Sequence, residues 1–544
     1  MGKTNYFAGM LPPPKLRGNY RTDLPARAAY AEGAGIYRII PAAVALPADT
    51  ADLLELLRWA AAGSVPLVPR GAGSGMGGGN LGDGVVVDLT RLGSAVEVHP
   101  ESRRARASAA TTHQALNLAA TAHGLRLPPD PSSGKFATLG GMLSTNAAGA
   151  RSVRYGSVRP WVRAAEVVTA DAEVIRLERG QAPSSASAAV SRFEQNAAGA
   201  IRASAAAVAA GFPRTRKNSS GYALDAWLES GDLLDLFIGA EGTLGIVTSA
   251  EWRLDLVPAA TAALRIALGS LDVLGDAVQA LAPHQPSAVE LLDRTFLELV
   301  HSRSPGAVGA AEALLLVELE GSSARAASRA AVEAADSVRP LALSVETALE
   351  PADVDQLWSI RHAASPILAG LPETRRSLQV IEDGCVPIDR LGDYVRGVRQ
   401  AAAARGIDIV LFGHAGDGHL HCNLLPEIAR PGWEGEVASL LEEVTALVIR
   451  LGGTTSGEHG DGRLRAPAVE QLFGPHVCSL FRAVKDAFDP RGILNPGIKL
   501  GTAPAVARLK VGSGAVELPD GIASGLREIE RRAGYATPRL SLIP

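Results

Sequence analysis

One glycine-rich stretch of the chain concentrates imidazole side chains. GHAGDGHLHCN, at residues 413–423, contains His414, His419 and His421 directly after an apolar run that is typical of a strand. His414 and His421 lie seven positions apart across a Gly-Asp-Gly turn. A strand–turn–strand hairpin could therefore aim both side chains at one site. The stretch is too short to be a zinc finger, so we interpret it as part of a larger site.

A second stretch supplies residues that would complete such a site. TTSGEHGDGRLR, at 454–465, contains Glu458, a hard oxygen ligand, and His459, a neighbouring base. Two imidazoles and one carboxylate with an open position suit a catalytic zinc or a related divalent ion. One histidine alone is more often a structural residue, but four of the chain's eleven histidines fall in these two stretches. We predict a divalent metal, with zinc as the expected ion, bound by His414, His421 and Glu458.

A third stretch, PRGAGSGMGGGN at 69–80, has six glycines in twelve positions after a strand-like run. Glycine permits positive φ and lets backbone N–H groups converge on an anion such as a pyrophosphate. The alternative is a glycine-rich loop without a ligand. The spacing does not lead cleanly into a helix, so the stretch differs from a Rossmann fingerprint.

Helical and strand patterns alternate around these stretches. Residues 48–63 have a helical apolar period after an Asp cap, and 84–92, 164–177 and 244–254 are strand candidates. A second block of helices and strands begins near Pro258. The predicted fold class is α+β, divided into an arm (1–32), a first domain (33–256), a second domain (257–500) and a tail with one amphipathic helix (501–544).

Composition excludes several classes of protein. The 544 residues are 47% hydrophobic and 20% charged, which is typical of globular chains with two or three domains. A net charge of −4 argues against nucleic acid as the main partner. Three cysteines without a CxxC pair argue against a disulfide framework and a cysteine-bound iron–sulfur cluster. The sequence shows neither a signal peptide nor a long apolar run, so we expect a cytoplasmic protein without a membrane span.

Further motifs carry a family resemblance. LPPDPSSGKFATLGGMLSTNAAGARSVRYGSV (127–158), FIGAEGTLGIVT (237–248) and FDPRGILNPGIK (488–499) follow the loop at 69–80 in order. Together they resemble the flavin-binding half of the vanillyl-alcohol-oxidase-type flavoproteins, the PCMH-type FAD-binding domain, over about residues 33–256. The resemblance implies an FAD cofactor and a PCMH-type domain followed by an FAD-linked oxidase C-terminal cap domain.

The resemblance also assigns residues to FAD. The loop at 69–80 would wrap the pyrophosphate, and the motif at 127–158 would line the adenine and ribose. The motifs at 237–248 and 488–499 would approach the flavin. Some relatives bind the flavin covalently through a histidine of the first loop, and this loop has none. Non-covalent FAD is therefore expected, with contacts from Pro69, Arg70, Gly71, Ala72, Gly73, Ser74, Gly75, Met76, Gly77, Asn80, Pro131, Ser132, Thr138, Gly141, Ser144, Asn146, Ala148, Gly149, Glu241, Gly242, Gly245, Ile246, Val247 and Asn495.

The two histidine stretches resemble the C-terminal domain of the FAD-linked 2-hydroxyacid dehydrogenases. That family includes D-lactate dehydrogenase, the glycolate oxidase flavin subunit and D-2-hydroxyglutarate dehydrogenase. WSIRHAASPIL, at 358–368, matches the segment whose arginine holds the substrate carboxylate. The resemblance implies that His414, His421 and Glu458 bind the metal, that His459 and Arg361 are catalytic, and that Arg361, Ser365, Asn423 and His459 contact the substrate.

The implied activity is oxidation of a D-2-hydroxy acid such as D-lactate or glycolate, with hydride passing to the flavin N5. The electrons would leave to a separate acceptor: an iron–sulfur subunit, an electron-transfer flavoprotein or a quinone system, with membrane association only through such a partner. The alternatives are an electron-transfer subunit, an oxygen-using oxidase, and non-redox use of the flavin as in the related ether-lipid synthase. The sequence leaves a homodimer open.

Two positions depart from the family pattern. His419 replaces the usual asparagine and is expected to be either a fourth ligand or a substrate contact. Relatives that oxidise dicarboxylates have a lysine near the position of Ile381, where this chain has LQVIEDGCVP. A second substrate carboxylate is therefore not expected.

Overall fold

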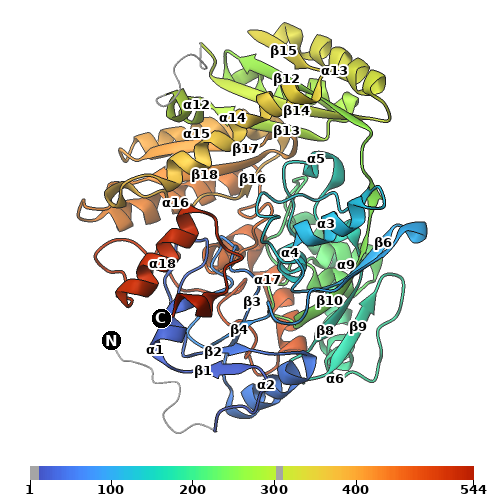
Figure 1. The fold of residues 1–544 in the computed structure, drawn as a ribbon, viewed down its shortest axis with the longest axis vertical. Coiled ribbons are helices and arrows are strands. Elements are labelled where there is room, and N and C mark those ends of the chain that lie inside the picture. The colour runs from blue at the N-terminus through green and yellow to red at the C-terminus, as the bar shows by residue number, and fades with distance from the viewer. Residues whose placement is uncertain (1–11, 302–309, 544) are drawn as a thin grey trace.

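The computed structural model describes residues 12–301 and 310–543, whose strands form four sheets (Figure 1). The seven-stranded sheet and its helices form a C-terminal half, at the top of the view. The other sheets form an N-terminal half below it. Helices and strands are mixed throughout, which confirms the α+β prediction. In the part of the chain that the structure describes, no helix is long and apolar enough to cross a membrane.

The first sheet carries the glycine-rich stretch. Its buried strands β2, β4 and β3 run parallel and consist largely of Val, Ala and Leu. A parallel connection needs a crossover, and α2 (Thr50–Gly63) supplies it after Asp49 caps its first turn. The predicted helix over 48–63 is thus confirmed, and β3 runs directly into the stretch at 69–80. The sheet order is β1 (Asn19–Arg21), β2 (Ala43–Leu46), β4 (Val85–Asp88), β3 (Leu67–Arg70).

The second sheet is antiparallel and joins distant parts of the chain. β10 inserts between β6 and β8, and the predicted strand over 164–177 is in fact two strands, β8 and β9. Helix α17 (Val469–Phe488) returns from the C-terminal part of the chain, and its Phe488 stacks on Phe193 at 5.4 Å between centroids. The order is β5 (Val96–His99), β6 (Arg104–Ser108), β10 (Ile246–Arg253), β8 (Val162–Val168), β9 (Val174–Glu178). A small third sheet pairs β7 (Leu125–Arg126) with β11 (Asp255–Leu256).

The described parts of the arm and the tail pack on the first sheet. The arm contributes β1 and α1 (Leu24–Ala29), and Tyr30 is buried. The tail contains the expected amphipathic helix, α18 (Asp520–Arg531), which lies close to α1 (Figure 1). Ile522 and Leu526 of α18 join one apolar cluster with Tyr30. The arm is therefore integrated into the N-terminal half, and the tail also contacts the C-terminal half, where Leu509 and Val511 join the core of the seven-stranded sheet.

The seven-stranded sheet positions the histidine stretch. Its first face is covered by α11 (Leu274–Leu281), α13 (Ala324–Val338), α15 (Leu391–Ala403) and α16 (Trp433–Arg450). α12 (Arg294–His301) packs on the second face. The strand order is β15 (Ser344–Ala348), β12 (Ala260–Leu268), β14 (Ala313–Gly321), β13 (Ala288–Asp293), β17 (Asp408–His414), β18 (His419–Leu425), β16 (Gly384–Cys385).

Strand alternation decides which side chains reach the second face. β17 and β18 form the predicted hairpin, in which Phe412 lies opposite His421, and Glu290 of β13 lies opposite His414. Directly opposed residues point to the same side of a sheet. Leu411, the neighbour of Phe412 along β17, belongs to the apolar core of the first face. The histidines and Glu290 therefore share the second face.

Candidate active site

A cavity of about 880 Å³ lies between the two halves and collects most of the predicted site residues. All the residues predicted to contact FAD lie on its wall except Asn146 and Asn495. The opposite wall includes residues of the second sheet face and of the loop at 454–465. The predicted substrate and metal residues on it are Arg361, His414, His421, Asn423, Glu458 and His459.

The glycine-rich wall fits a long anionic cofactor. Gly73 has φ +77°, and a Cβ there would lie 2.4 Å from the Arg70 guanidinium. A Cβ on Gly149 would lie 2.3 Å from the Asp130 carbonyl oxygen. The backbone can thus line the cavity closely only because these residues lack side chains. Asn80 Oδ1, on the same wall, is buried and has no hydrogen-bond partner among the described residues.

Three side chains predicted to serve the flavin make structural contacts. Arg70 is buried and donates to the Glu32 carbonyl oxygen at 2.8 Å, which supports the glycine loop from behind. The Glu241 carboxylate accepts the backbone N–H of Asp461 at 2.8 Å. Asn495 Nδ2 donates to the carbonyl oxygen of Glu241 at 2.8 Å. These bonds hold the segments that surround the cavity against one another.

Asn146 also lies behind the wall. It is buried at the C-terminal end of α4 (Leu139–Thr145), where its φ of +53° ends the helix. Its Oδ1 atom has no hydrogen-bond partner among the described residues. The residue therefore shapes the turn that leads to Ala148 and Gly149 on the wall.

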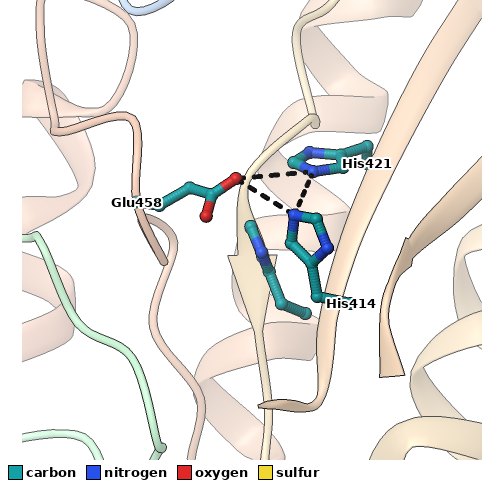
Figure 2. Close-up of side chains that lie close together, drawn as sticks. His414, His421 and Glu458 are labelled. Carbon is teal, nitrogen blue, oxygen red and sulfur yellow. Dashed lines mark hydrogen bonds and ion pairs between the residues drawn. The ribbon is translucent and has the colours of Figure 1, made fainter. Parts of the chain in front are cut away.

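Three ligand atoms face one another at the predicted metal site (Figure 2). His414 Nε2 lies 3.3 Å from Glu458 Oε1 and 3.3 Å from His421 Nε2. His421 Nε2 lies 3.6 Å from Glu458 Oε1. An ion about 2.1 Å from each ligand in a tetrahedral arrangement requires ligand atoms about 3.4 Å apart. The spacing therefore fits a zinc-sized ion with one coordination position open to the cavity.

Hydrogen bonds fix both imidazoles in the orientation that ligation needs. His414 Nδ1 is hydrogen-bonded to the Glu290 carboxylate, and His421 Nδ1 to the carbonyl oxygen of Glu382 at 2.7 Å. An Nδ1–H that donates leaves the lone pair on Nε2. Two such lone pairs facing each other repel unless a proton or a cation lies between them. The donor set therefore fits a divalent ion.

Lys217 orients the third ligand. It is buried, and its Nζ donates to Glu458 Oε2 at 3.0 Å, which leaves Oε1 facing the histidines. Burial alone would raise the pKa of the Glu458 carboxyl, but Lys217 and His414 hold that pKa well below its usual range. The carboxylate is therefore ionised and presents one oxygen to the site.

His419 lies behind the ligands and not on the cavity wall. One of its nitrogens comes within 4.8 Å of the other ligand atoms, which would allow a fourth ligand. However, the side chain is fully buried, and Nε2 is hydrogen-bonded to Asp383 Oδ1 at 3.0 Å. Its Nδ1 lies 3.4 Å from Lys217 Nζ. Both nitrogens make contacts within the protein, and the two roles expected for His419 stay predictions.

Two adjacent acids hold the loop that carries Glu458 and His459. Asp383 accepts the backbone N–H groups of these two residues at 3.0 and 2.9 Å. Glu382 accepts a hydrogen bond from His459 Nδ1 and is itself paired with Arg465. Burial would lower the pKa of His459, but Glu382 and Asp383 raise it to about 9. The pair orients His459, whose Nε2 lies 3.6 Å from Glu458 Oε1.

Arg361 reaches the cavity from α14 (Pro351–Ala369). Its Nε donates to Glu290 Oε2 at 2.7 Å, and its guanidinium carbon lies 4.4 Å from the centroid of the Phe412 ring. Within the described residues, its two terminal nitrogens have no hydrogen-bond partner and remain available to a carboxylate. Burial opposes ionisation of Glu290, but His414 and Arg361 lower its pKa to about 2.

Asn423 and Ser365 are the two remaining residues predicted to contact the substrate. Asn423 lies on the cavity wall and accepts a hydrogen bond from Ser377 Oγ through Oδ1 at 2.9 Å. This contact leaves the amide nitrogen of Asn423 for a ligand. Ser365 lies in α14, but its side chain is outside the described part of the chain.

Sequence reasoning missed the residues that support the ligands. A glutamate inside the apolar run AVELLD was the signal for Glu290, and a consecutive acid pair after an apolar run was the signal for Glu382 and Asp383. Lys217, in RKNSSGY, has no comparable signal, because its partner lies more than two hundred residues away in the chain.

Two family models match the chain. The model described as "FAD binding domain" matches residues 41–178, and the model described as "FAD linked oxidases, C-terminal domain" matches residues 257–498. Together these models cover both walls of the cavity apart from the wall residues at 241–247.

Solved structures with the same fold share little sequence with this chain. p-Cresol methylhydroxylase with substrate bound superposes with a TM-score of 0.65 at 15% identity. The superposed part covers 89% of this chain and 94% of that chain. An alkyldihydroxyacetonephosphate synthase superposes with a TM-score of 0.60 at 16% identity, and covers 88% of this chain and 83% of its own. At such identities the likeness concerns the fold alone.

Curated relatives are closer in sequence. The glycolate oxidase subunit GlcD of Bacillus subtilis is 30% identical over 466 residues, 85% of this chain and 89% of that protein. The D-lactate dehydrogenase of Archaeoglobus fulgidus is 31% identical over 84% of this chain and 90% of that protein. The D-2-hydroxyglutarate dehydrogenase of Pseudomonas putida is 31% identical over 89% of this chain, which spans half of that longer protein. The chain therefore belongs to the FAD-linked 2-hydroxyacid dehydrogenase family and is an FAD-dependent oxidoreductase.

Proposed function

We propose that this protein oxidises a D-2-hydroxy acid, with FAD as the hydride acceptor and a divalent metal as Lewis acid. The observation that carries the proposal is the convergence of Arg361, the His414–His421–Glu458 trio and His459 on one wall of the cavity. The facing wall comprises the loops assigned to FAD. In this proposal, residues 33–256 form the flavin domain and residues 257–500 the substrate domain.

Arg361 and His459 have separate tasks in the proposed reaction. Arg361 binds the substrate carboxylate through its terminal nitrogens and orients Cα. His459, in its neutral form, accepts the hydroxyl proton at Nε2, while its Nδ1–H donates to Glu382. FAD, when bound, takes up the hydride from Cα, so that a 2-oxo acid results. A divalent ion, when bound by the trio, polarises the hydroxyl group.

The intact set of site residues disfavours the non-catalytic alternative. An electron-transfer subunit needs a flavin but needs neither a metal site nor an arginine free to bind a carboxylate. Side chains that fit both features lie here on the wall of the cavity, which supports the catalytic reading. Non-redox use of the flavin rests only on the likeness of fold to the synthase, which says nothing of chemistry.

The cavity favours a substrate with one carboxylate. Besides Arg361, the arginines on its wall are Arg70, whose guanidinium supports the glycine loop, and Arg151, which pairs with Asp130 and Glu318. Ile381, near the position of the lysine in dicarboxylate relatives, is buried in the core of the sheet and is not on the wall. Gln379 and Asp355 line the cavity instead.

A substrate panel tests the proposal. With an artificial dye as acceptor, D-lactate and other D-2-hydroxy monocarboxylates should be oxidised, and their L-enantiomers should not. D-2-hydroxyglutarate should have a kcat/KM lower by about tenfold or more, because its second carboxylate meets no free cation among the described residues of the wall. Preference for the dicarboxylate would contradict this reading of the cavity.

FAD is expected to be bound without a covalent bond. The glycine-rich stretch at 69–80 contains no histidine, cysteine or tyrosine that could attach to the flavin. Acid or heat precipitation of the yellow protein should release all the flavin into the supernatant. Flavin that stays with the denatured polypeptide would show that a covalent link exists.

Reoxidation of the reduced flavin is expected to need a separate electron acceptor. The sequence has no cysteine set for an iron–sulfur cluster and no CxxCH for haem attachment. We propose an iron–sulfur subunit, an electron-transfer flavoprotein or a quinone system as that acceptor. Dyes should support turnover well and oxygen poorly. Oxygen-driven turnover as fast as with dye, with stoichiometric peroxide, would identify an oxidase instead.

A further inference from the structure

One buried side chain connects the metal site with the carboxylate-binding arginine. Glu290 is 0% exposed and lies on β13, directly opposite His414 on β17. Its Oε1 accepts a hydrogen bond from His414 Nδ1, and its Oε2 accepts one from Arg361 Nε at 2.7 Å. Each oxygen of the carboxylate therefore holds a different functional residue.

The chemistry of the two contacts requires a carboxylate. His414 must donate from Nδ1 so that its Nε2 lone pair can bind an ion, and Arg361 donates from Nε. Because the two donors approach different oxygens of the carboxyl group, a side chain that accepts from both in this arrangement needs an acceptor at each of the two positions. Glutamine has one acceptor oxygen and one donor nitrogen, so it can satisfy only one of the two partners.

We propose that Glu290 is a positioning residue that sets His414 and Arg361 relative to each other. It keeps His414 in the ligating tautomer and leaves the terminal nitrogens of Arg361 for the substrate. One carboxylate thereby fixes the separation between the ion that contacts the hydroxyl group and the guanidinium that contacts the carboxylate. This inference rests on the proposed function, since it concerns the same metal and the same substrate.

A purely structural role for Glu290 would have a different consequence. A buried acid that only neutralises an arginine contributes to stability, and its loss lowers the melting temperature. Asp293 is a buried acid on the same strand whose contacts, with Arg399 and with the backbone N–H and hydroxyl of Thr295, are structural. It is also 0% exposed, pairs with Arg399 at 2.6 Å, and lies away from the cavity wall. Asp293→Asn is therefore the matched control.

The test measures two quantities on flavin-loaded wild type, Glu290→Gln, Glu290→Met and Asp293→Asn. The first is the Kd for Zn²⁺, from competition with a chromophoric chelator. The second is the KM, at saturating Zn²⁺, for the 2-hydroxy acid that reduces the wild-type flavin fastest. Glu290→Met should raise the Kd by about 10–100-fold, the usual effect of losing a bond to a metal-bound histidine. It should also raise the KM by about tenfold or more, because the guanidinium loses its charged partner.

Glu290→Gln should raise at least one of the two quantities by about tenfold, and Asp293→Asn should leave both within about twofold. Glu290→Met with both values unchanged, or with only one of them changed, would overturn the shared role. An equal effect of Asp293→Asn would assign the changes to general destabilisation and would also overturn it. A wild type that binds no zinc would instead refute the proposed metal site, so the two failures can be distinguished.

Discussion

His459→Ala is expected to slow reduction of the flavin by the substrate by about 10²–10⁴-fold, the usual effect of removing a general base. His459 Nε2 lies 3.6 Å from Glu458 Oε1, so the variant loses the proton acceptor beside the metal site. FAD and metal should stay bound, because His459 is not one of the three ligands. Stopped-flow absorbance under anaerobic conditions measures the rate directly.

A control separates this loss from a general effect of removing imidazole. His476 is exposed and does not line the cavity, and its Nε2 is hydrogen-bonded to Ser204 Oγ at 3.1 Å. In His476→Ala the substrate should therefore reduce the flavin at the wild-type rate. Near-normal reduction in His459→Ala would assign the base to another residue, and loss of FAD or metal in that variant would point to a structural role.

Glu458→Ala is expected to lower bound metal and activity together. A three-ligand site with an open position tolerates the loss of one ligand poorly. Polarisation by a metal ion contributes several kcal/mol to such reactions, so flavin reduction should slow by about 10²-fold or more. Elemental analysis of the purified variant and its reduction rate are the measurements. Lys217 also loses its contact with Glu458 at 3.0 Å, which adds a second reason for a weakened site.

Chelation and a surface variant complete this test. Wild-type protein treated with a chelator should lose activity and recover part of it with added divalent metal. Glu470 is an exposed glutamate paired with Arg482, and Glu470→Ala should keep its metal and its rate. Full activity in metal-free wild-type protein would show that the His414–His421–Glu458 cluster is no catalytic metal site.

Local sequence patterns predicted the parts of the site that follow one another along the chain. The spacing of His414 and His421 across a Gly-Asp-Gly turn predicted the hairpin that the structure contains. The glycine run at 69–80 predicted a closely approaching backbone, which Gly73 confirms through its positive φ. These features depend on a few consecutive residues, so the chemistry of each residue is sufficient to predict them.

Long-range pairings could not be predicted in this way. Glu290 reaches His414 only because β13 and β17 pair in one particular register, and no residue near Glu290 indicates that register. Lys217 belongs to the N-terminal half and meets Glu458 only when the two halves are docked. The role of His419 likewise depended on a distant residue, Asp383. Local patterns within one sequence carry no information about which distant segments meet.

The most direct test of the proposed function is an anaerobic reaction between the purified, metal-loaded protein and a D-2-hydroxy monocarboxylate. The visible flavin absorbance should be lost, with one molecule of 2-oxo acid formed for each flavin reduced. The L-enantiomer of the same acid should leave the flavin spectrum unchanged. A flavin that stays oxidised with every D-2-hydroxy acid, in protein shown to contain both FAD and metal, would contradict the account.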